Sequence, residues 1–580
     1  MFRKAIAAAI IVGLVWAVSF SSPAFAWVTP PTPTLVYDGG AGNAGDILQG
    51  AVPANWQAKP VLVFVQGLHG SANNWWGPIT YYGDNDMYAY AYNNGYRTFF
   101  VQFRDADGNA GSMWLNGSML RQQLEWITKY AGVSQVNIVA HSKGGVDSQS
   151  AIVHYGAYPY VNRVLTLSSP HRGSELADLS YSWYAWWLGA LLGQHDDGTY
   201  VMQTGYMDYF RSITDGRPED IGMDHYYTLG GTHHGPLFSA LWFGGTYLNA
   251  YGSNDGVVRT YSAHALPGHS ADPTSSSWNH DNIRMGSQVF GYVNSFAGQL
   301  TAAEPSGAGY LAAGAKAATA YRVAALGDQE VAAASAEAEQ SAVESGSIYR
   351  GGEFTQGRAV ETVPVETGVQ SVTFDVLTAA PGLDVAVLSP SGKRLTAGQR
   401  SQADEYFQGA ERIALTVDRP EAGLWTIEMD ATGGASAASA ASVANTSGAY
   451  LLTASLEGGV RAVLNRPGLV APGENLSLNI SLTGGRGAVA SGSATGTLVR
   501  TASGKARPVR VTDARLDRFT QGQGVGGRLA APGQEGVYNL SLTVTGTLSD
   551  GSAFERSLVT SFAVARPEAR DAAHLRAWIK

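Results

Sequence analysis

Residues 138–146, Ile-Val-Ala-His-Ser-Lys-Gly-Gly-Val, restrict the fold of this chain more than any other segment. An apolar run leads straight into a turn of small residues around Ser142, and a stretch compatible with a helix follows. A buried strand that ends in so sharp a turn can hold a serine hydroxyl out at its tip on strained backbone. The segment therefore predicts a strand, a turn and a helix, with Ser142 as a candidate nucleophile.

Ala140 is a departure from the usual Gly-x-Ser-x-Gly pattern of such turns. Alanine is the smallest alternative to glycine, and a small side chain is what tight packing at the turn requires. A serine that only caps a helix after a strand is the ordinary alternative. For Ser142 to be catalytic, the rest of the chain must supply an acid, a histidine and donors for an oxyanion.

Length and composition limit the class of protein. A chain of 580 residues is too long for one hydrophobic core and indicates about three domains. The net charge of −9 and the lack of a basic run argue against a nucleic-acid partner. The chain contains no cysteine, which excludes thiol catalysis and thiolate metal sites.

Residues 1–26 have the pattern of a signal peptide. Arg3 and Lys4 precede an apolar stretch at residues 5–18, and Ala24-Phe25-Ala26 fits a cleavage site. The apolar stretch is shorter than the ~20 residues that a membrane-spanning helix needs. The pattern predicts a protein that is secreted to the extracellular space.

Residues 27–301 alternate strand-like and helix-like segments, which predicts an α/β domain with a doubly wound, mostly parallel sheet. The strand candidates are apolar runs at residues 61–65, 98–103, 136–140 and 164–167. We expect the first and third of these runs in the middle of the sheet. A helical spacing of apolar residues ends at Gly132, which predicts the end of a helix there.

The rest of the chain has a different character. Residues 302–345 are rich in Ala, Glu and Ser and predict a linker. Short strand candidates separated by polar turns predict two β-sandwich modules, over 346–457 and, in an immunoglobulin-like style, over 458–566. Residues 567–580 are then a tail.

The loop Gln66-Gly67-Leu68-His69-Gly70 directly follows the apolar run 61–65. A glycine-bearing loop at the end of a buried strand can aim a backbone N–H at a developing oxyanion, beside the N–H of the residue after the nucleophile. We assign these two donors to Leu68 and Lys143. An ordinary glycine turn is the alternative for the loop when it is taken alone.

In chains with this kind of turn, the acid follows the serine and the histidine comes last. Asp255 lies in a turn beside a Val-Val pair, although Asp-Gly is also a common plain turn. His280 lies 25 residues beyond Asp255 and just before an apolar-periodic stretch, 283–296, that predicts a last helix. His264 and His269 flank a Pro-Gly turn and are interpreted as surface residues, so we assign the histidine to His280.

Together these segments resemble the true-lipase group of secreted bacterial lipases, within the α/β-hydrolase superfamily. The resemblance covers about residues 60–295, and the run Pro170–Asp178 is its most specific part, because no generic turn explains that run. It implies a triacylglycerol lipase that cleaves lipid esters through an acyl-enzyme. The matching motifs are Gln66-Gly67-Leu68, Ala140-His141-Ser142-Lys143-Gly144-Gly145, Ser169-Pro170-His171-Arg172-Gly173-Ser174, Asn254-Asp255-Gly256-Val257-Val258 and Asn279-His280.

Two further departures concern the oxyanion loop and a metal. Gln66 stands where the group usually has histidine, which leaves the backbone donor intact. Relatives in the group often carry a structural Ca²⁺, with an aspartate two residues after the histidine. Here that position is Asn282, and Asp281 is one residue off. The chemistry needs no cofactor, and the resemblance leaves a structural calcium ion open, without assigned ligands.

Residues of about 179–250 are expected to form a cap over the site. Trp183, Trp186 and Trp187 give this segment an aromatic character and are candidate substrate contacts. Core packing under the cap is the alternative. The pair His233-His234 is interpreted as structural or pocket-lining, because no carboxylate stands at ligand spacing on a clear helix.

Two other functions fit the sequence less well. An extracellular depolymerase of polyesters such as polyhydroxyalkanoate also needs a secreted serine hydrolase with appended β-sandwiches. A non-catalytic binding or adhesion protein on a hydrolase scaffold is disfavoured by a complete serine, acid and histidine set. The expected partners are a lipid or another water-insoluble ester, with peripheral contact to a lipid interface. The C-terminal modules are expected to bind substrate or the cell surface.

Overall fold

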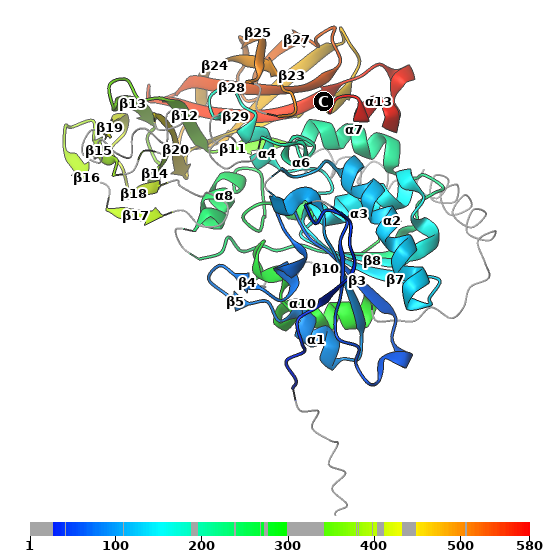
Figure 1. Cartoon of the computed structure of the whole chain (residues 1–580). Coiled ribbons are helices and arrows are strands. Elements are labelled where there is room, and N and C mark those ends of the chain that lie inside the picture. The colour runs from blue at the N-terminus through cyan, green and yellow to red at the C-terminus, as the bar shows by residue number, and fades with distance from the viewer. Residues whose placement is uncertain are drawn as a thin grey trace, which may run out of the picture.

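The computed structural model describes residues 27–579, except 41, 108, 187–194, 237–238, 267, 272–276, 298–341, 379, 381, 397, 403–410, 432–447 and 505–506. The predicted signal peptide, Trp187 and most of the predicted linker lie outside the described residues. Figure 1 shows the α/β part below and the two β-rich parts above it.

An eight-stranded sheet forms the centre of the α/β part, and its order is β1-β2-β6-β3-β7-β8-β9-β10. The six strands from β6 to β10 in this order run parallel, while β1 and β2 are antiparallel. The predicted mostly parallel sheet is confirmed, with β3 and β7 in its middle. The strands are β1 (Thr34–Tyr37), β2 (Ile47–Gln49), β6 (Arg97–Val101), β3 (Val61–Val65), β7 (Val136–His141), β8 (Val161–Leu167), β9 (Tyr226–Leu229) and β10 (His269–Ala271).

Both faces of this sheet are covered, which is why β3 is an unbroken apolar run. Val61, Val63 and Val65 pack in one cluster with helices α2 (Met113–Ala131) and α3 (Lys143–Tyr155). Leu62 and Phe64 point the other way and pack with α1 (Met87–Asn93) and α10 (Gly286–Tyr292). The alternation along one strand therefore produces the doubly wound arrangement that the sequence predicts.

Two helices were predicted from the spacing of apolar residues, and the structure agrees with one of them more closely than with the other. Helix α2 ends at Gly132, whose φ of 67° is the left-handed cap that glycine adopts easily. The predicted single helix over 283–296 is wrong in detail. The structure divides it into a 3₁₀ turn at Asn282–Arg284, α10, and a π turn at Val293–Ala297.

The first β-rich part is a sandwich around the buried Trp425 and Phe374. Its two sheets have the orders β12-β20-β14-β18-β17 and β13-β19-β15-β16, all antiparallel. The strands are β12 (Ser347–Glu353), β13 (Arg358–Val365), β14 (Ser371–Thr378), β15 (Asp384–Leu388), β16 (Arg394–Thr396), β17 (Gln399–Gln402), β18 (Glu411–Asp418), β19 (Gly423–Asp430) and β20 (Ala449–Glu457).

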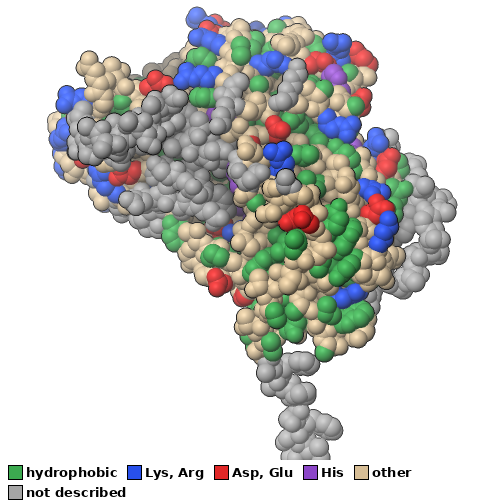
Figure 2. Space-filling model, in the orientation of Figure 1, with side chains coloured by type: hydrophobic (Ala, Val, Ile, Leu, Met, Phe, Trp, Pro, Cys, Tyr) green, Lys and Arg blue, Asp and Glu red, His purple; other side chains and the backbone are tan. Residues whose placement is uncertain are grey.

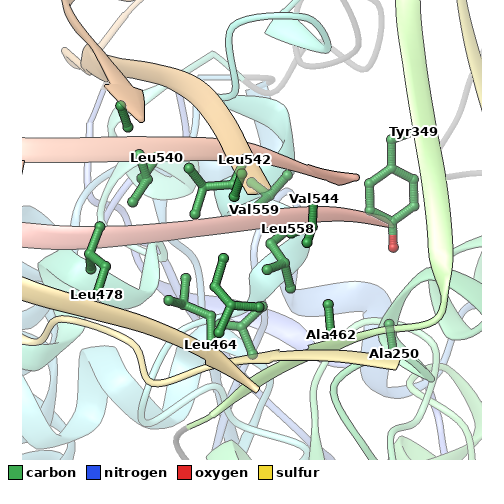
Figure 3. Packing of buried hydrophobic residues seen from close by; sticks show 14 of the residues in the cluster. Ala250, Tyr349, Ala462, Leu464, Leu478, Leu540, Leu542, Val544, Leu558 and Val559 are labelled. Atoms are coloured by element: carbon green, nitrogen blue, oxygen red, sulfur yellow. The ribbon is translucent and has the colours of Figure 1, made fainter. Parts of the chain in front are cut away.

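The second β-rich part is also a sandwich, with sheets β11-β21-β23-β27-β26 and β22-β29-β28-β24-β25. Figure 3 shows leucine and valine side chains of both sheets meeting in its core. The strands are β11 (Val343–Ser345), β21 (Val460–Leu464), β22 (Leu469–Val470), β23 (Asn475–Gly484), β24 (Val489–Arg500), β25 (Val509–Leu516), β26 (Arg518–Thr520), β27 (Gly524–Ala530), β28 (Gly536–Leu548) and β29 (Ala553–Val564). Helix α13 (Ala572–Arg576) follows.

The cap segment lies between the central sheet and the β-sandwiches. Its helices are α4 (Glu175–Ser180), α6 (Asp197–Tyr200), α7 (Thr204–Thr214) and α8 (Ala240–Leu248). Figure 1 shows α4 and α7 directly beneath β29. The core of the second sandwich continues into the cap through Leu179, Phe243, Tyr247 and Leu248. The apolar side of the cap is thus covered by the C-terminal modules in the full chain.

The surface carries charges of both signs. Figure 2 shows Lys and Arg side chains scattered among Asp and Glu side chains over both parts of the molecule. Within the described ranges, no helix combines the length and the apolar character needed to cross a membrane.

Candidate active site

Ser142 occupies the turn between β7 and α3, with φ of 53° and ψ of −134°. A positive φ is strained for a residue other than glycine, and such strain persists only where the surroundings fix it. The backbone N–H of Ser142 donates to the carbonyl of Leu167 on the neighbouring strand, at 2.9 Å. A Cβ added to Gly144 would lie 2.3 Å from the carbonyl oxygen of Gln66, so this position requires glycine.

The structure brings Ser142, His280 and Asp255 together. Nε2 of His280 lies 3.0 Å from the Ser142 hydroxyl, and Nδ1 of His280 lies 2.8 Å from a carboxylate oxygen of Asp255. The backbone N–H of His280 also donates to the carbonyl of Asp255, at 3.0 Å. All three side chains are buried. In this line the neutral imidazole can accept the serine proton and direct its other N–H at the carboxylate.

The Asp255 carboxylate is held in its charged form. Its second oxygen accepts the backbone N–H groups of Val257 at 2.9 Å and Val258 at 2.7 Å. Burial alone raises the pKa of Asp255, but the charge and hydrogen bond of His280 outweigh it, so the net pKa is lowered. An ionised carboxylate at this place stabilises a protonated His280 ring.

His141 supports His280 from behind, and sequence reasoning missed it. Its Nε2 donates to the carbonyl of His280 at 2.7 Å, and the two ring centroids are 4.8 Å apart. Burial, then the nearby charge of His280, lowers the pKa of His141 well below its usual value, so its ring is neutral. Its position before the serine was the only signal in the sequence.

The loop that carries Leu68 lies against the serine. A Cβ added to Gly67 would lie 2.7 Å from the Cβ of Ser142, which shows how closely the two backbones approach. The N–H of Gly70 donates to the carbonyl of Gly67 at 3.1 Å and closes a turn around Leu68 and His69. The N–H of Lys143 belongs to the first turn of α3, where it has no helical acceptor.

Gln66 anchors the start of this loop. With its amide oriented to satisfy both neighbours, it donates to the carbonyl of Val101 at 2.5 Å and accepts from the N–H of Phe103 at 2.8 Å. The usual histidine is therefore replaced by a side chain that binds the loop to the end of β6.

The side chain of Lys143 is buried in a cluster of charges under α3. Its Nζ lies 2.9 Å from both carboxylate oxygens of Asp147 and 3.8 Å from Asp105. Asn116 donates to both carboxylates, at 2.7 Å to Asp105 and 2.9 Å to Asp147. Burial raises the pKa of Asp147 to about 7 against the opposing effect of Lys143. These contacts fix the first turn of α3.

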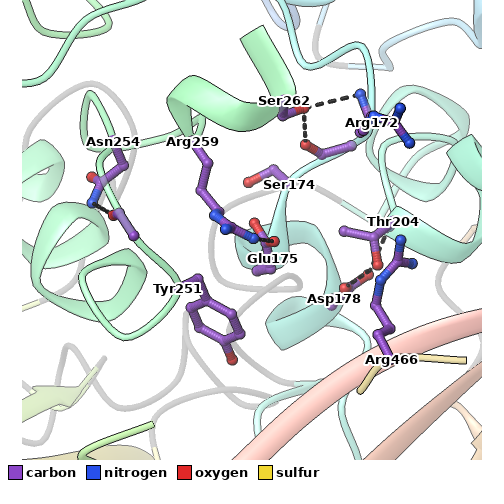
Figure 4. Close-up of polar contacts among 12 residues, drawn as sticks. Arg172, Ser174, Glu175, Asp178, Thr204, Tyr251, Asn254, Arg259, Ser262 and Arg466 are labelled. Carbon is purple, nitrogen blue, oxygen red and sulfur yellow. Dashed lines mark hydrogen bonds and ion pairs between the residues drawn. The ribbon is translucent and has the colours of Figure 1, made fainter. Parts of the chain in front are cut away.

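The run from Pro170 to Asp178 holds the segment that follows Asp255. The N–H of Arg172 donates to the Ser262 hydroxyl at 3.0 Å, and Ser174 donates to the carbonyl of Val257 at 2.6 Å. Glu175 forms an ion pair with Arg259 at 2.8 Å. Figure 4 shows the contacts of Arg172 with Ser262 and of Glu175 with Arg259. The most specific motif of the sequence therefore positions the acid.

The structure places Trp186 of the cap beside the second sandwich. Trp183 is half exposed, while Trp186 packs against the core that the cap and the sandwich share. The Arg507 guanidinium lies 5.2 Å from the Trp186 ring. Trp187 lies outside the described residues. Substrate contact by these tryptophans stays a prediction.

The structure also places the four other histidines that the sequence analysis considered, His233, His234, His264 and His269. His233 accepts the N–H of Gly235 at 3.0 Å, and His234 packs closely against Gly245 in α8. His264 is wrongly interpreted as a surface residue, because it is half-buried and its Nδ1 contacts the Thr228 hydroxyl at 3.0 Å. His269 lies on the edge strand β10 and is exposed.

The residues after His280 do not form a calcium cage. Asp281 faces Arg284 at 3.4 Å, and the side-chain oxygen of Asn282 accepts the N–H of Asn279 at 2.8 Å. Ca²⁺ takes six to eight oxygen ligands. Among the residues whose placement is described, no group of three or more His, Asp or Glu side chains is arranged to hold a metal.

A doubly wound sheet, a serine on a sharp turn after a central parallel strand, and a histidine before the last helix define an α/β-hydrolase fold. Residues 56–185 match the family model of the PGAP1-like alpha/beta domain. The propeptide form of the lipase BlEst2 from Bacillus licheniformis is 27% identical, with a TM-score of 0.64, over 90% of this chain and 97% of that one.

The mature form of the same lipase is 40% identical over 44% of this chain and 100% of its own length, with a TM-score of 0.40. The carboxylesterase CesB from Bacillus subtilis is 13% identical over 47% of this chain and 92% of its own, with a TM-score of 0.27. The chain belongs to the bacterial lipases and esterases of the α/β-hydrolase superfamily. It is an ester hydrolase.

Proposed function

We propose that Ser142, His280 and Asp255 are the catalytic triad of this ester hydrolase. The observation that carries the proposal is the continuous line of contacts from the Ser142 hydroxyl through His280 to the buried Asp255 carboxylate. His280 takes the serine proton as the hydroxyl attacks the ester carbonyl. It then gives the proton to the leaving alcohol, and water resolves the acyl-enzyme by the reverse sequence.

The backbone N–H groups of Leu68 and Lys143 are the proposed oxyanion donors. Both belong to segments that adjoin Ser142, one through Gly67 and one through the peptide bond itself. A single preorganised donor of this kind contributes about 3 kcal/mol to lowering the barrier. The two donors act on the tetrahedral intermediates of both acylation and deacylation.

Lipid esters are the proposed substrates, and the enzyme is proposed to be a secreted triacylglycerol lipase. The apolar cap beside the site and the likeness to a lipase over nearly the whole chain support this substrate class. The pattern of residues 1–26 supports secretion. The catalytic steps draw only on the chain's own residues and need no cofactor.

Ser142→Ala tests the triad, with Ser295→Ala as the matched control because Ser295 is an exposed serine near the end of the domain. We expect Ser142→Ala to lose about 10⁴-fold or more of the turnover of a soluble short-chain ester, and the control to keep it. Full activity of Ser142→Ala on every ester would refute the triad. Comparing the hydrolysis of emulsified long-chain triglyceride with that of polyester film then distinguishes a lipase from a polyester depolymerase.

We also propose that the C-terminal sandwiches act as a propeptide that covers the cap. The supporting comparison is the match along 90% of this chain to a lipase described as a propeptide form. The supporting contacts are the ion pair between Arg466 and Asp208 and the apolar core that continues from α8 into β29. The Ala-, Glu- and Ser-rich segment 302–345 is the proposed place of cleavage.

A site for a specific protease, inserted near residue 320, tests this second proposal. Cleavage should increase hydrolysis of emulsified triglyceride without a change in the intrinsic rate for a small soluble ester. Unchanged lipid hydrolysis after complete cleavage and separation of the modules would contradict a covering role. Loss of adsorption to insoluble substrate would instead make the modules binding domains.

A further inference from the structure

The turn that carries Leu68 contains a strained residue that glycine does not occupy. His69 has a φ of 55°, a left-handed conformation that few side chains adopt. It is the third residue of the turn closed by Gly67 and Gly70, where glycine or asparagine is usual. A histidine at this position has a conformational cost, so a contact of its side chain must hold it there.

The contact that holds His69 is a hydrogen bond with Asp196. Nε2 of His69 lies 2.6 Å from a carboxylate oxygen of Asp196, which is buried. The same carboxylate accepts the N–H groups of Thr199 at 2.8 Å and Ala110 at 3.1 Å. Burial raises the pKa of Asp196, but the hydrogen bond and charge of His69 bring the net pKa below its usual value. Asp196 is thus a charged group in a fixed place.

Helix α6, which Asp196 caps, also packs directly on Leu68. A Cβ added to Gly198 would lie 2.6 Å from a methyl carbon of Leu68 and 2.6 Å from Ala110. The next residue toward the sandwiches, Asp197, accepts a hydrogen bond from Ser503 in the second module. The short segment 196–200 therefore contacts the oxyanion loop on one side and the C-terminal module on the other.

We propose that His69 and Asp196 are positioning residues that hold the Leu68 N–H in place to bind the oxyanion. The contact between His69 and Asp196 fixes the strained turn, and α6 packs against the Leu68 side chain. The inference rests on the proposed role of the Leu68 loop in catalysis. Neither side chain touches the reacting atoms, so their effect is on turnover rather than on substrate affinity.

The variants His69→Asn and Asp196→Asn test the pair in the full chain. Asparagine tolerates the left-handed backbone at 69, so His69→Asn removes mainly the contact with Asp196. At 196 asparagine can still accept the N–H of Thr199, but Asp196→Asn removes the acceptor of Ala110 together with that of His69. For a soluble short-chain ester we expect kcat to fall about 10- to 100-fold with KM within about 3-fold, a fraction of what one lost donor costs. The double variant should be no slower than Asp196→Asn alone, because that change already breaks the contact with His69.

His574→Asn is the matched control. Its ring pairs with Glu535 at 3.1 Å with a similar exposure, 29% against 25% for His69, but it lies in the C-terminal part of the chain. This variant should keep the wild-type kcat. A second measurement is hydrogen exchange of the backbone amides at 66–70, which should become faster in both test variants and stay unchanged in the control.

The outcomes separate this inference from the proposed triad. If Ser142→Ala retains turnover, the proposed triad itself is contradicted. An inactive Ser142→Ala together with wild-type kcat in His69→Asn or Asp196→Asn would overturn only the positioning role. If turnover of the full chain is too slow to compare, unchanged protection of residues 66–70 in the test variants overturns it.

Discussion

At the scale of single residues, Lys143 combines two roles. Its backbone N–H is a proposed oxyanion donor, and its side chain neutralises two buried carboxylates, Asp105 and Asp147. Replacing one member of a buried ion cluster leaves the others uncompensated, which costs about 3–5 kcal/mol. We therefore expect Lys143→Met to lower the free energy of unfolding by that amount, measured by denaturant unfolding.

Lys129→Met is the control for this prediction. Lys129 pairs with Glu125 at 2.7 Å, but its side chain is 73% exposed, so solvent screens the pair and the substitution should change the free energy of unfolding little. Equal effects of the two substitutions would mean that the buried cluster adds nothing beyond a surface pair.

Ser142, Asp255 and His280, the proposed triad, could be selected from the sequence because each lies in a local motif and their order along the chain is fixed. His141 and Gln66 could not, because their roles depend on partners far away in sequence. His141 binds the carbonyl of His280, and Gln66 binds Val101 and Phe103. A residue type alone carries no information on such a partner.

At the scale of elements, α8 acts as a spacer behind the acid. A Cβ added to Gly244 would lie 2.1 Å from the carbonyl oxygen of Gly256, the residue after Asp255. We expect Gly244→Ala to push this turn away and to lower kcat about 10-fold or more, since misplacement by about 1 Å can cost 100-fold. Soluble-ester kinetics measure the effect.

Gly291→Ala in α10 is the matched change, because open space surrounds that position. It should leave kcat unchanged and stabilise the helix by up to about 1 kcal/mol. A kcat for Gly244→Ala equal to that of Gly291→Ala would show that α8 does not position the acid.

The strands of all three parts were the best predicted elements, because each is a short apolar or alternating run bounded by turns. Buried strands β3 and β7 contain their predicted segments, 61–65 and 136–140. The last helix was predicted as one piece because its apolar periodicity continues through 283–296. The chain is extended at Met285, with ψ of 138°, and becomes a π turn at Val293, and periodicity does not encode either change.

At the scale of the whole molecule, the cap lies between the central sheet of the α/β part and the second sandwich. The aromatic segment of about residues 179–250 was expected either to contact substrate or to pack in a core, and its Phe243 and Tyr247 pack with the second sandwich in the full chain. The sequence could not decide between these partners, because an apolar face fits lipid and protein equally well. Which partner covers the apolar face of the cap can be seen only in the folded chain.

Asp178 makes the contact between cap and module sensitive to pH. It accepts hydrogen bonds from Thr204 and from Ser561 of β29, the latter at 2.7 Å, and Asn539 donates to its carbonyl at 2.8 Å. Figure 4 shows it beside Thr204 and Arg466. Burial raises the pKa of Asp178 to about 6 against the hydrogen bonds that favour the carboxylate.

The sign of the effect follows from the raised pKa. In an unfolded chain the carboxyl ionises near pH 4, so between about pH 4 and 6 the folded state holds a proton that the unfolded state has lost. Stability from this group is complete below pH 4 and is lost as the pH rises through 6. The loss is about 2–3 kcal/mol, since each pKa unit corresponds to about 1.4 kcal/mol.

Asp178→Asn removes this titration, because asparagine stays neutral at every pH. Relative to wild type, the variant should gain about 2–3 kcal/mol of stability between pH 4 and pH 7. Denaturant unfolding at a series of pH values measures the difference. Asp384→Asn, at a side chain that is 82% exposed, should keep the wild-type pH profile. If Asp178→Asn also keeps that profile, the carboxyl at 178 ionises without cost, and the contact between cap and module does not depend on its proton.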